Sequence, residues 1–66
     1  MMPLFTFYPC RADGSSPAFE SIECQDDADA MTRARRVLED HLSAVQVVIW
    51  HGERQVGALA RAGSPA

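Results

Sequence analysis

Hydrophobic and polar residues follow a helical period over residues 26–43, the only long stretch of the chain that does so. Apolar side chains recur there at spacings of three and four, which places them on one face of a helix. That face holds Ala30, Met31, Ala34, Val37, Leu38, His41 and Leu42. Carboxylates at the start of the stretch favour the positive end of the helix dipole, and Asp26 is the predicted N-cap.

The opposite face of this helix is charged and polar. It carries Asp29, Thr32, Arg33, Arg36, Glu39 and Asp40. Three pairs of opposite charge stand four residues apart: Asp29–Arg33, Arg35–Glu39 and Arg36–Asp40. Such pairs contribute only about 0.2–0.5 kcal/mol each, whereas burial of a large apolar side chain contributes about 1.5–3 kcal/mol. The charges are therefore expected to keep the outer face soluble while the apolar face packs on a sheet.

Short runs rich in β-branched and aromatic residues flank the helix on both sides. They cover residues 4–10 and 18–24 before it, and 44–51 and 54–61 after it. Asp13–Gly14 supplies a turn signal between the first two runs, and Gly52 suits the first central position of a type II′ turn between the last two.

This order of elements predicts an α+β fold. We expect a ββαββ domain over residues 1–61, with a four-stranded antiparallel sheet and one helix packed on one face. The preference for right-handed crossovers favours a strand order of 2-1-3-4. Residues 62–66 are expected to form a flexible C-terminal tail.

The faces of the sheet follow from strand alternation. Phe5 and Phe7 share one face of the first strand, and Leu4, Thr6 and Tyr8 share the other. A regular register in the last hairpin pairs Trp50 with Gln55 and Val47 with Ala58. The helix side would then hold Val45, Val47, Ile49, Val56, Ala58 and Ala60, and the other side Gln46, Val48, Trp50, Gln55, Gly57 and Leu59.

Val48, Trp50 and Leu59 are therefore predicted to form an apolar patch on the side away from the helix, with Leu4 or Tyr8 beside them. No other segment is left to cover this patch, and an exposed apolar patch of this kind marks an interface. The alternative is a half-exposed Trp50 shielded by the C-terminal tail.

The size of the chain also favours a partner. A chain of 66 residues forms one domain and buries only about 60% of its unfolded surface, so small domains often add a disulfide, a metal or a second subunit. A net charge of −3 argues against a general affinity for nucleic acid or anionic membranes. No apolar run approaches the roughly 20 residues that span a membrane, and the start of the chain has no signal-peptide pattern. A cytoplasmic homodimer is expected.

Strand register tests whether Cys10 and Cys24 form a disulfide. If residues 4–10 and 17–24 form a hairpin about Asp13–Gly14, the two cysteines stand about seven rungs apart, or on the order of 20 Å. A disulfide needs Cα atoms within about 7 Å. Two free, mostly buried thiols are predicted.

Other chemistry has weaker support. Arg33, Arg35 and Arg36 are the candidates for contact with nucleic-acid phosphates, but acidic neighbours neutralise much of their charge and no stacking aromatic shares their face. His41 is expected at the core or its rim, and His51 is expected to be solvent-exposed at a hairpin tip. No CxxC or HxxxH spacing supports a zinc site. No catalytic residue, metal or cofactor is predicted.

The order of short motifs resembles a group of small bacterial proteins of unknown function that are common in alphaproteobacteria. The resemblance rests on MPLFTF at residues 2–7, SIEC at 21–24 before the Ala-rich helix, and the closing Val-x-Val/Ile hairpin. It covers most of the chain, although Cys24 stands where the group carries Leu and the usual Asp/Gly-rich connection between the first two strands is lacking. The resemblance implies the ββαββ fold and no activity.

Two functions therefore stay open. The first is a self-associating interaction module with Val48, Trp50, Leu59 and Tyr8 at its interface. The alternative is a regulatory protein that contacts nucleic acid through Arg33, Arg35 and Arg36.

Overall fold

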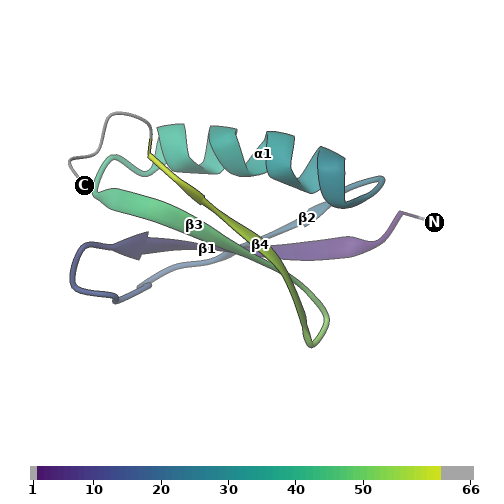
Figure 1. Ribbon diagram of the computed structural model, residues 1–66, viewed down its shortest axis with the longest axis horizontal. Coiled ribbons are helices and arrows are strands. Elements are labelled where there is room, and N and C mark those ends of the chain that lie inside the picture. Colours follow the sequence, from purple (N-terminus) through teal and green to yellow (C-terminus); the bar gives the residue numbers. More distant parts are fainter. Residues whose placement is uncertain (1, 62–66) are drawn as a thin grey trace.

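A computed structural model describes residues 2–61 and shows the ββαββ order that the sequence predicts. The elements are β1 (Leu4–Arg11), β2 (Glu20–Glu23), α1 (Asp27–Asp40), β3 (Ala44–His51) and β4 (Arg54–Ala60). All four strands form one antiparallel sheet in the order β2-β1-β3-β4, which confirms the favoured strand order. The helix α1 lies across one face of the sheet (Figure 1), and the predicted tail at 62–66 lies outside the described residues.

The helix starts where the sequence predicts and ends earlier. Asp26 is the N-cap, and its Oδ1 atom accepts a hydrogen bond of 2.8 Å from the Asp29 backbone N–H. His41 is the C-cap with φ −116°, and the Ala44 N–H donates to the His41 carbonyl as the chain turns into β3. The prediction that Leu42 joins the apolar face is therefore wrong, because this turn leaves its side chain 85% exposed.

The core lies between α1 and the sheet. Ala30 and Ala34 are fully buried on the helix, and their small side chains let α1 approach Phe5 and Phe7 of β1 closely. The other buried members of this cluster are Cys24, Val37, Leu38, Ala44, Val47 and Ile49. Phe5 and Phe7 thus share the helix side of β1, as alternation predicts.

The first hairpin has the predicted turn and separates the two cysteines. The Gly14 N–H donates to the Arg11 carbonyl, and Gly14 adopts φ +87°, a left-handed conformation that glycine favours. At the other end of the hairpin, the Cys24 N–H donates to the Pro3 carbonyl at 3.0 Å. Cys10 and Cys24 therefore lie at opposite ends of β1, and both are buried free thiols as predicted.

A β-bulge changes the predicted faces of β4. Trp50 pairs with Gln55 as expected, but Ile49 then pairs with Gly57 and Val47 with Leu59, so Val56 is an extra residue. A one-residue insertion sends every later side chain to the opposite face. Leu59 therefore packs against the core below α1, and the prediction that it lies beside Val48 and Trp50 is wrong. Gly57 faces Met31, whereas Ala58 and Ala60 move to the side away from the helix.

A second irregularity occurs where the end of β1 pairs with the start of β3. Cys10 pairs with Gln46 and Arg11 with Ala44, which leaves Val45 without a partner in β1. Ala44 takes the buried position beneath the end of α1, and Val45 is 39% exposed. Val45 was expected on the helix side with Val47 and Ile49, but it is exposed and Ala44 takes the buried position; as for Leu59, the cause is an extra residue in one strand.

Candidate functional site

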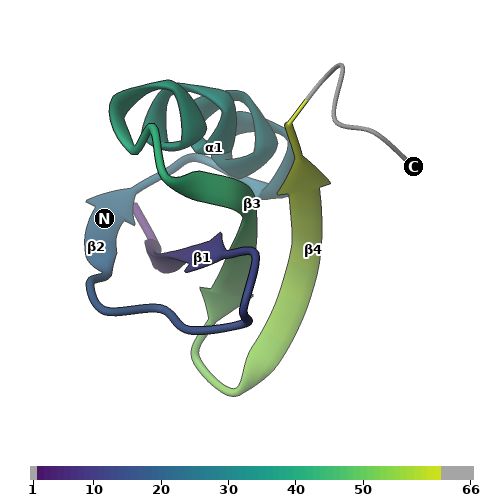
Figure 2. The same ribbon diagram turned by 90° about the vertical axis from the view of Figure 1, so that its left-hand side faces the viewer.

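The face of the sheet away from α1 carries no other element among residues 2–61 (Figure 2). Tyr8 pairs with Val48 across β1 and β3, and Val48 pairs with Ala58 across β3 and β4. On the other side of Tyr8 lies Phe19, just before β2, with the two ring centroids 5.9 Å apart. Directly paired residues share a face. An apolar row formed by Phe19, Tyr8, Val48 and Ala58 therefore crosses the whole sheet.

A second row lies one step along the strands. Thr6 is paired with Ser21 on one side and with Trp50 on the other, and Trp50 is paired with Gln55. The indole of Trp50 thus lies among uncharged polar side chains, beside the apolar row. We call these two rows together the open face; its members are Thr6, Tyr8, Phe19, Ser21, Val48, Trp50, Gln55 and Ala58.

The open face is hollowed and partly exposed. A shallow hollow runs over it, lined by Thr6, Tyr8, Cys10, Ser16, Val48, Trp50, Gly52 and Glu53. Phe19 is 63% exposed, which is unusual for a phenylalanine, while Tyr8, Val48 and Trp50 are half-buried. The face therefore presents aromatic and aliphatic atoms to its surroundings, with few charges among them.

Three of the four predicted interface residues meet on this face, and the fourth does not. Tyr8, Val48 and Trp50 lie together, whereas Leu59 lies on the helix side because of the bulge. Phe19 is a member that the sequence reasoning missed. Its signal was present, because Phe19 alternates in phase with Ser21 and out of phase with Ile22, whose side chain packs against the core.

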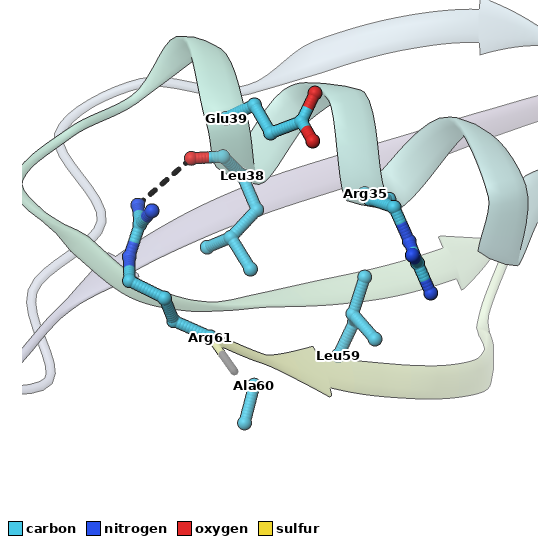
Figure 3. Close-up of a pocket in the computed structure, with 6 residues that line it drawn as sticks. All are labelled: Arg35, Leu38, Glu39, Leu59, Ala60 and Arg61. Atoms are coloured by element: carbon cyan, nitrogen blue, oxygen red, sulfur yellow. Dashed lines mark hydrogen bonds between the residues drawn. The ribbon is translucent and has the colours of Figure 1, made fainter. Parts of the chain in front are cut away.

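The three candidate arginines of α1 do not form one free patch. The Arg33 guanidinium lies 3.5 Å from the Asp29 carboxylate, and that of Arg36 lies 3.4 Å from the Asp40 carboxylate, so two of the three predicted pairs are confirmed; among residues 2–61 the third, Arg35–Glu39, forms no ion pair. Arg35 instead lines a hollow between α1 and β4 (Figure 3). Two of the three positive charges are thus offset by adjacent carboxylates.

Arg61 holds the end of α1 against the sheet. Its Nη2 atom donates to the carbonyl oxygens of Leu38 at 2.8 Å, His41 at 3.0 Å and Ala44 at 2.9 Å, and its Nε atom donates to Ala44 at 3.1 Å. Figure 3 shows this side chain turned toward the last turn of the helix. Because the carbonyls at a helix C-terminus lack partners within the helix, the guanidinium satisfies them and also complements the helix dipole. Arg61 therefore has a structural role that its place at the end of a predicted strand did not reveal.

The two histidines are placed apart. His41 Nε2 lies 3.0 Å from Glu20 Oε2, which links the end of α1 to the start of β2. The His51 ring stacks on Phe5 with centroids 4.7 Å apart and is half-buried, so the expectation of a solvent-exposed His51 is wrong: the ring covers the edge of the core. Within residues 2–61, no three side chains of His, Cys, Asp or Glu gather as a metal site.

The buried thiol of Cys24 is a poor nucleophile. Burial raises its pKa above the ordinary value, and the nearby Asp29 carboxylate raises the pKa further. A thiol in this state stays protonated at neutral pH, whereas the thiolate is the reactive form. Cys24 therefore serves as an apolar core residue, in contact with the cluster beneath α1.

These features define a small α+β domain with one helix on one face of an antiparallel sheet and an apolar, aromatic surface on the other. In comparisons with known proteins, no family model, no curated protein and no solved structure matches this chain.

Across the described part of the chain, the structure contains no helix with the length and apolar character needed to cross a membrane.

Proposed function

We propose that this protein is a small interaction module that forms a homodimer through its open face. The observation that supports this most directly is the apolar row from Phe19 through Tyr8 and Val48 to Ala58, with Trp50 beside it. Aromatic side chains are enriched at the centres of protein interfaces, where desolvation makes them contribute most. Trp50 and Tyr8 are the expected anchors of the contact.

The dimensions of the face fit a second copy of the chain. The domain extends 38 Å by 19 Å along the sheet, so its whole side away from α1, with the open face at its centre, projects at most on the order of 700 Å², against the roughly 800 Å² that each partner gives to a standard interface. A twofold axis lets the same patch pair with itself, which is the usual arrangement in dimers. Burial of the face also adds apolar contact to a domain whose own core is small.

Truncation of Trp50 tests this proposal. Trp50→Ala should weaken association by about 2 kcal/mol or more, which is about a 30-fold increase in the dissociation constant. Light scattering behind size exclusion, over a wide range of protein concentrations, measures this change. Leu42→Ala is the matched control, because it removes an exposed apolar side chain that lies beyond α1 and away from the face.

The outcomes separate clearly. A dimer that dissociates at higher concentration in Trp50→Ala, and not in Leu42→Ala, supports the open face as the contact. A mass that stays monomeric in the wild type at high concentration contradicts self-association, and an unchanged dissociation constant in Trp50→Ala contradicts this face as its site.

A further inference from the structure

The two edges of the sheet differ in how they are protected. β2 forms one edge with only four residues, and Glu20 and Glu23 stand at its two ends. β4 forms the other edge (Figure 2). It has seven residues, no proline and no charged side chain after Arg54. Proteins usually protect edge strands by short length, charge or proline, because exposed backbone groups pair with other strands. β4 lacks these three protections, and its β-bulge at Val56 lies before the segment 58–60.

The one charged residue of β4 is turned away from its free edge. The Arg54 guanidinium makes two contacts with the Asp27 carboxylate at the start of α1, at 3.2 and 3.3 Å. This ion pair holds the charge on the helix side. The rest of β4 consists of Gln55, Val56, Gly57, Ala58, Leu59 and Ala60.

The backbone of β4 offers donors and acceptors at two consecutive outward positions. The Arg61 N–H donates to the Val45 carbonyl at 2.9 Å, which sets the phase of the ladder between β3 and β4. Residues in an antiparallel strand alternate between hydrogen bonding to one side and to the other. The backbone groups of Leu59 therefore face β3, and those of Ala58 and Ala60 face outward from the sheet.

A hollow beside this edge is lined by side chains of both charges. It lies between α1 and β4 and is lined by Arg35, Leu38, Glu39, Leu59, Ala60 and Arg61 (Figure 3). Arg35 and Glu39 stand one helical turn apart, and within residues 2–61 no ion pair joins them, whereas both other pairs of this spacing on α1 are formed. A twofold axis near Leu59 would bring Arg35 of each copy opposite Glu39 of the other.

We propose that β4 is a second association surface, at which a second copy of this chain adds its own β4 in antiparallel pairing centred on Leu59. Ala58 then exchanges backbone hydrogen bonds with Ala60 of the partner, and Ala60 with Ala58 of the partner. The two Leu59 side chains face each other on the helix side, and the sheet continues across both copies. This contact uses the outward backbone groups of Ala58 and Ala60 and the helix-side position of Leu59, whereas the open-face contact uses side chains on the opposite side of the sheet, so it stands whether or not the open face self-associates.

The geometry leaves room for the two helices. α1 packs mainly over β3, so the two helices would be separated by about three strand spacings, or about 14 Å. This gap is wider than the 8–10 Å of directly packed helices. In this arrangement Leu59 of each copy would lie at the bottom of the gap, with Arg35 and Glu39 of both helices above it.

A cysteine at the centre of the pairing tests the register. In Leu59→Cys, the two introduced thiols would belong to a non-hydrogen-bonded pair with Cα atoms about 4.5 Å apart, within disulfide range. Ala58→Cys is the matched control, because its two thiols would be displaced by two residues along the strands, with Cα atoms more than about 7 Å apart. Cys24 is buried in the core, and Cys10, which lines the hollow on the open face, is present in both variants, so oxidation through Cys10 contributes equally to both.

We expect Leu59→Cys to form a covalent dimer at least ten times faster than Ala58→Cys under mild oxidation, as measured on non-reducing gels. Equal rates overturn the proposed register. The variants are compared in the Trp50→Ala background as well, so that a failure of the open-face contact is seen separately from a failure at β4.

Proline at the edge gives a second test that does not depend on a cysteine in the core. Ala58→Pro removes only an outward N–H, so the ladder with β3 is kept and the circular dichroism spectrum should match that of the parent. In the Trp50→Ala background, Ala58→Pro should shift any remaining dimer to monomer by light scattering. A folded Ala58→Pro variant with an unchanged mass and an undiminished dimer fraction overturns the proposal, as does a Trp50→Ala protein that is monomeric at every concentration.

Discussion

Removal of the Arg61 guanidinium should destabilise the domain strongly. In Arg61→Ala, the carbonyls of Leu38, His41 and Ala44 lose a charged donor that lies 2.8–3.1 Å away. A hydrogen bond to a charged group contributes about 1.5–3 kcal/mol. These carbonyls are only partly buried and can form hydrogen bonds to water instead. We therefore expect a loss of about 1.5 kcal/mol for each of about two hydrogen bonds, or about 3 kcal/mol in total.

That loss is large for so small a domain. Stability of about 0.05–0.15 kcal/mol per residue gives a 66-residue chain on the order of 3–10 kcal/mol in all. At about 4–8 °C per kcal/mol, Arg61→Ala should lower Tm by about 12–24 °C. Thermal unfolding followed by far-UV circular dichroism measures the shift at fixed protein concentration, because association also raises Tm.

Two variants show whether the geometry of the guanidinium is responsible. Arg61→Lys keeps the positive charge near the helix end but cannot reach three carbonyls at once, so its Tm should fall between those of wild type and Arg61→Ala. Arg36→Ala removes an arginine whose ion pair with Asp40 is well exposed, and such pairs contribute about 0–1 kcal/mol. If Arg61→Ala melts no lower than Arg36→Ala, the proposed role of Arg61 is refuted.

Three further changes have definite expected results. Asp26→Ala removes the N-cap acceptor and should cost about 1 kcal/mol in urea unfolding, whereas Asp26→Asn should retain most of it. The raised pKa of Cys24 contributes stability that is present below the ordinary thiol pKa of 9.0 and is lost as pH rises through the folded pKa. Above pH 9, wild type should therefore lose up to about 1.4 kcal/mol of stability per pH unit relative to Cys24→Ala. Parallel profiles of stability against pH for the two proteins would contradict this. Deletion of Val56 removes the extra residue but leaves Leu59 opposite Val47 on the helix side, so it should cost less than Leu59→Ala, which should cost about 2 kcal/mol in urea unfolding; a deletion that costs more than Leu59→Ala would show that the bulge itself is needed to seat Leu59.

The parts of the fold that the sequence predicted are those in which two patterns agree. In β1, Phe5 and Phe7 alternate with Thr6 and Tyr8, so only one phase buries both phenylalanines. In α1, the capping residue Asp26 and the apolar face point to the same start. These elements and their faces are confirmed.

The β4 strand lacked such agreement, and its prediction failed. Every residue from Val56 to Ala60 is apolar or glycine, so neither phase of the strand is marked as the buried one. The turn at Gly52 fixes the pairing of Trp50 with Gln55 near the tip of the hairpin. The bulge that follows this pair depends on the packing of Leu59 under α1. That information lies in tertiary packing rather than in alternation.

The end of α1 was missed for a similar reason. The apolar period continues through Leu42, but His41 to Ala44 must turn the chain into β3, and Arg61 from the far end of the domain binds the carbonyls of that turn. Contacts between residues about 20 positions apart are not visible in a local pattern. The position of Phe19 on the open face, by contrast, could be predicted from strand alternation.

The position of Trp50 also determines what an optical experiment on this protein would report. It is the single tryptophan of the chain, and it lies on the open face rather than among the phenylalanines beneath α1. Indole emission depends on the polarity of its immediate surroundings, so its wavelength follows what covers that face. Titrations followed by tryptophan emission would therefore detect a partner that binds the open face. Loosened packing beneath α1 would leave the emission unchanged until the strands of the sheet unfold.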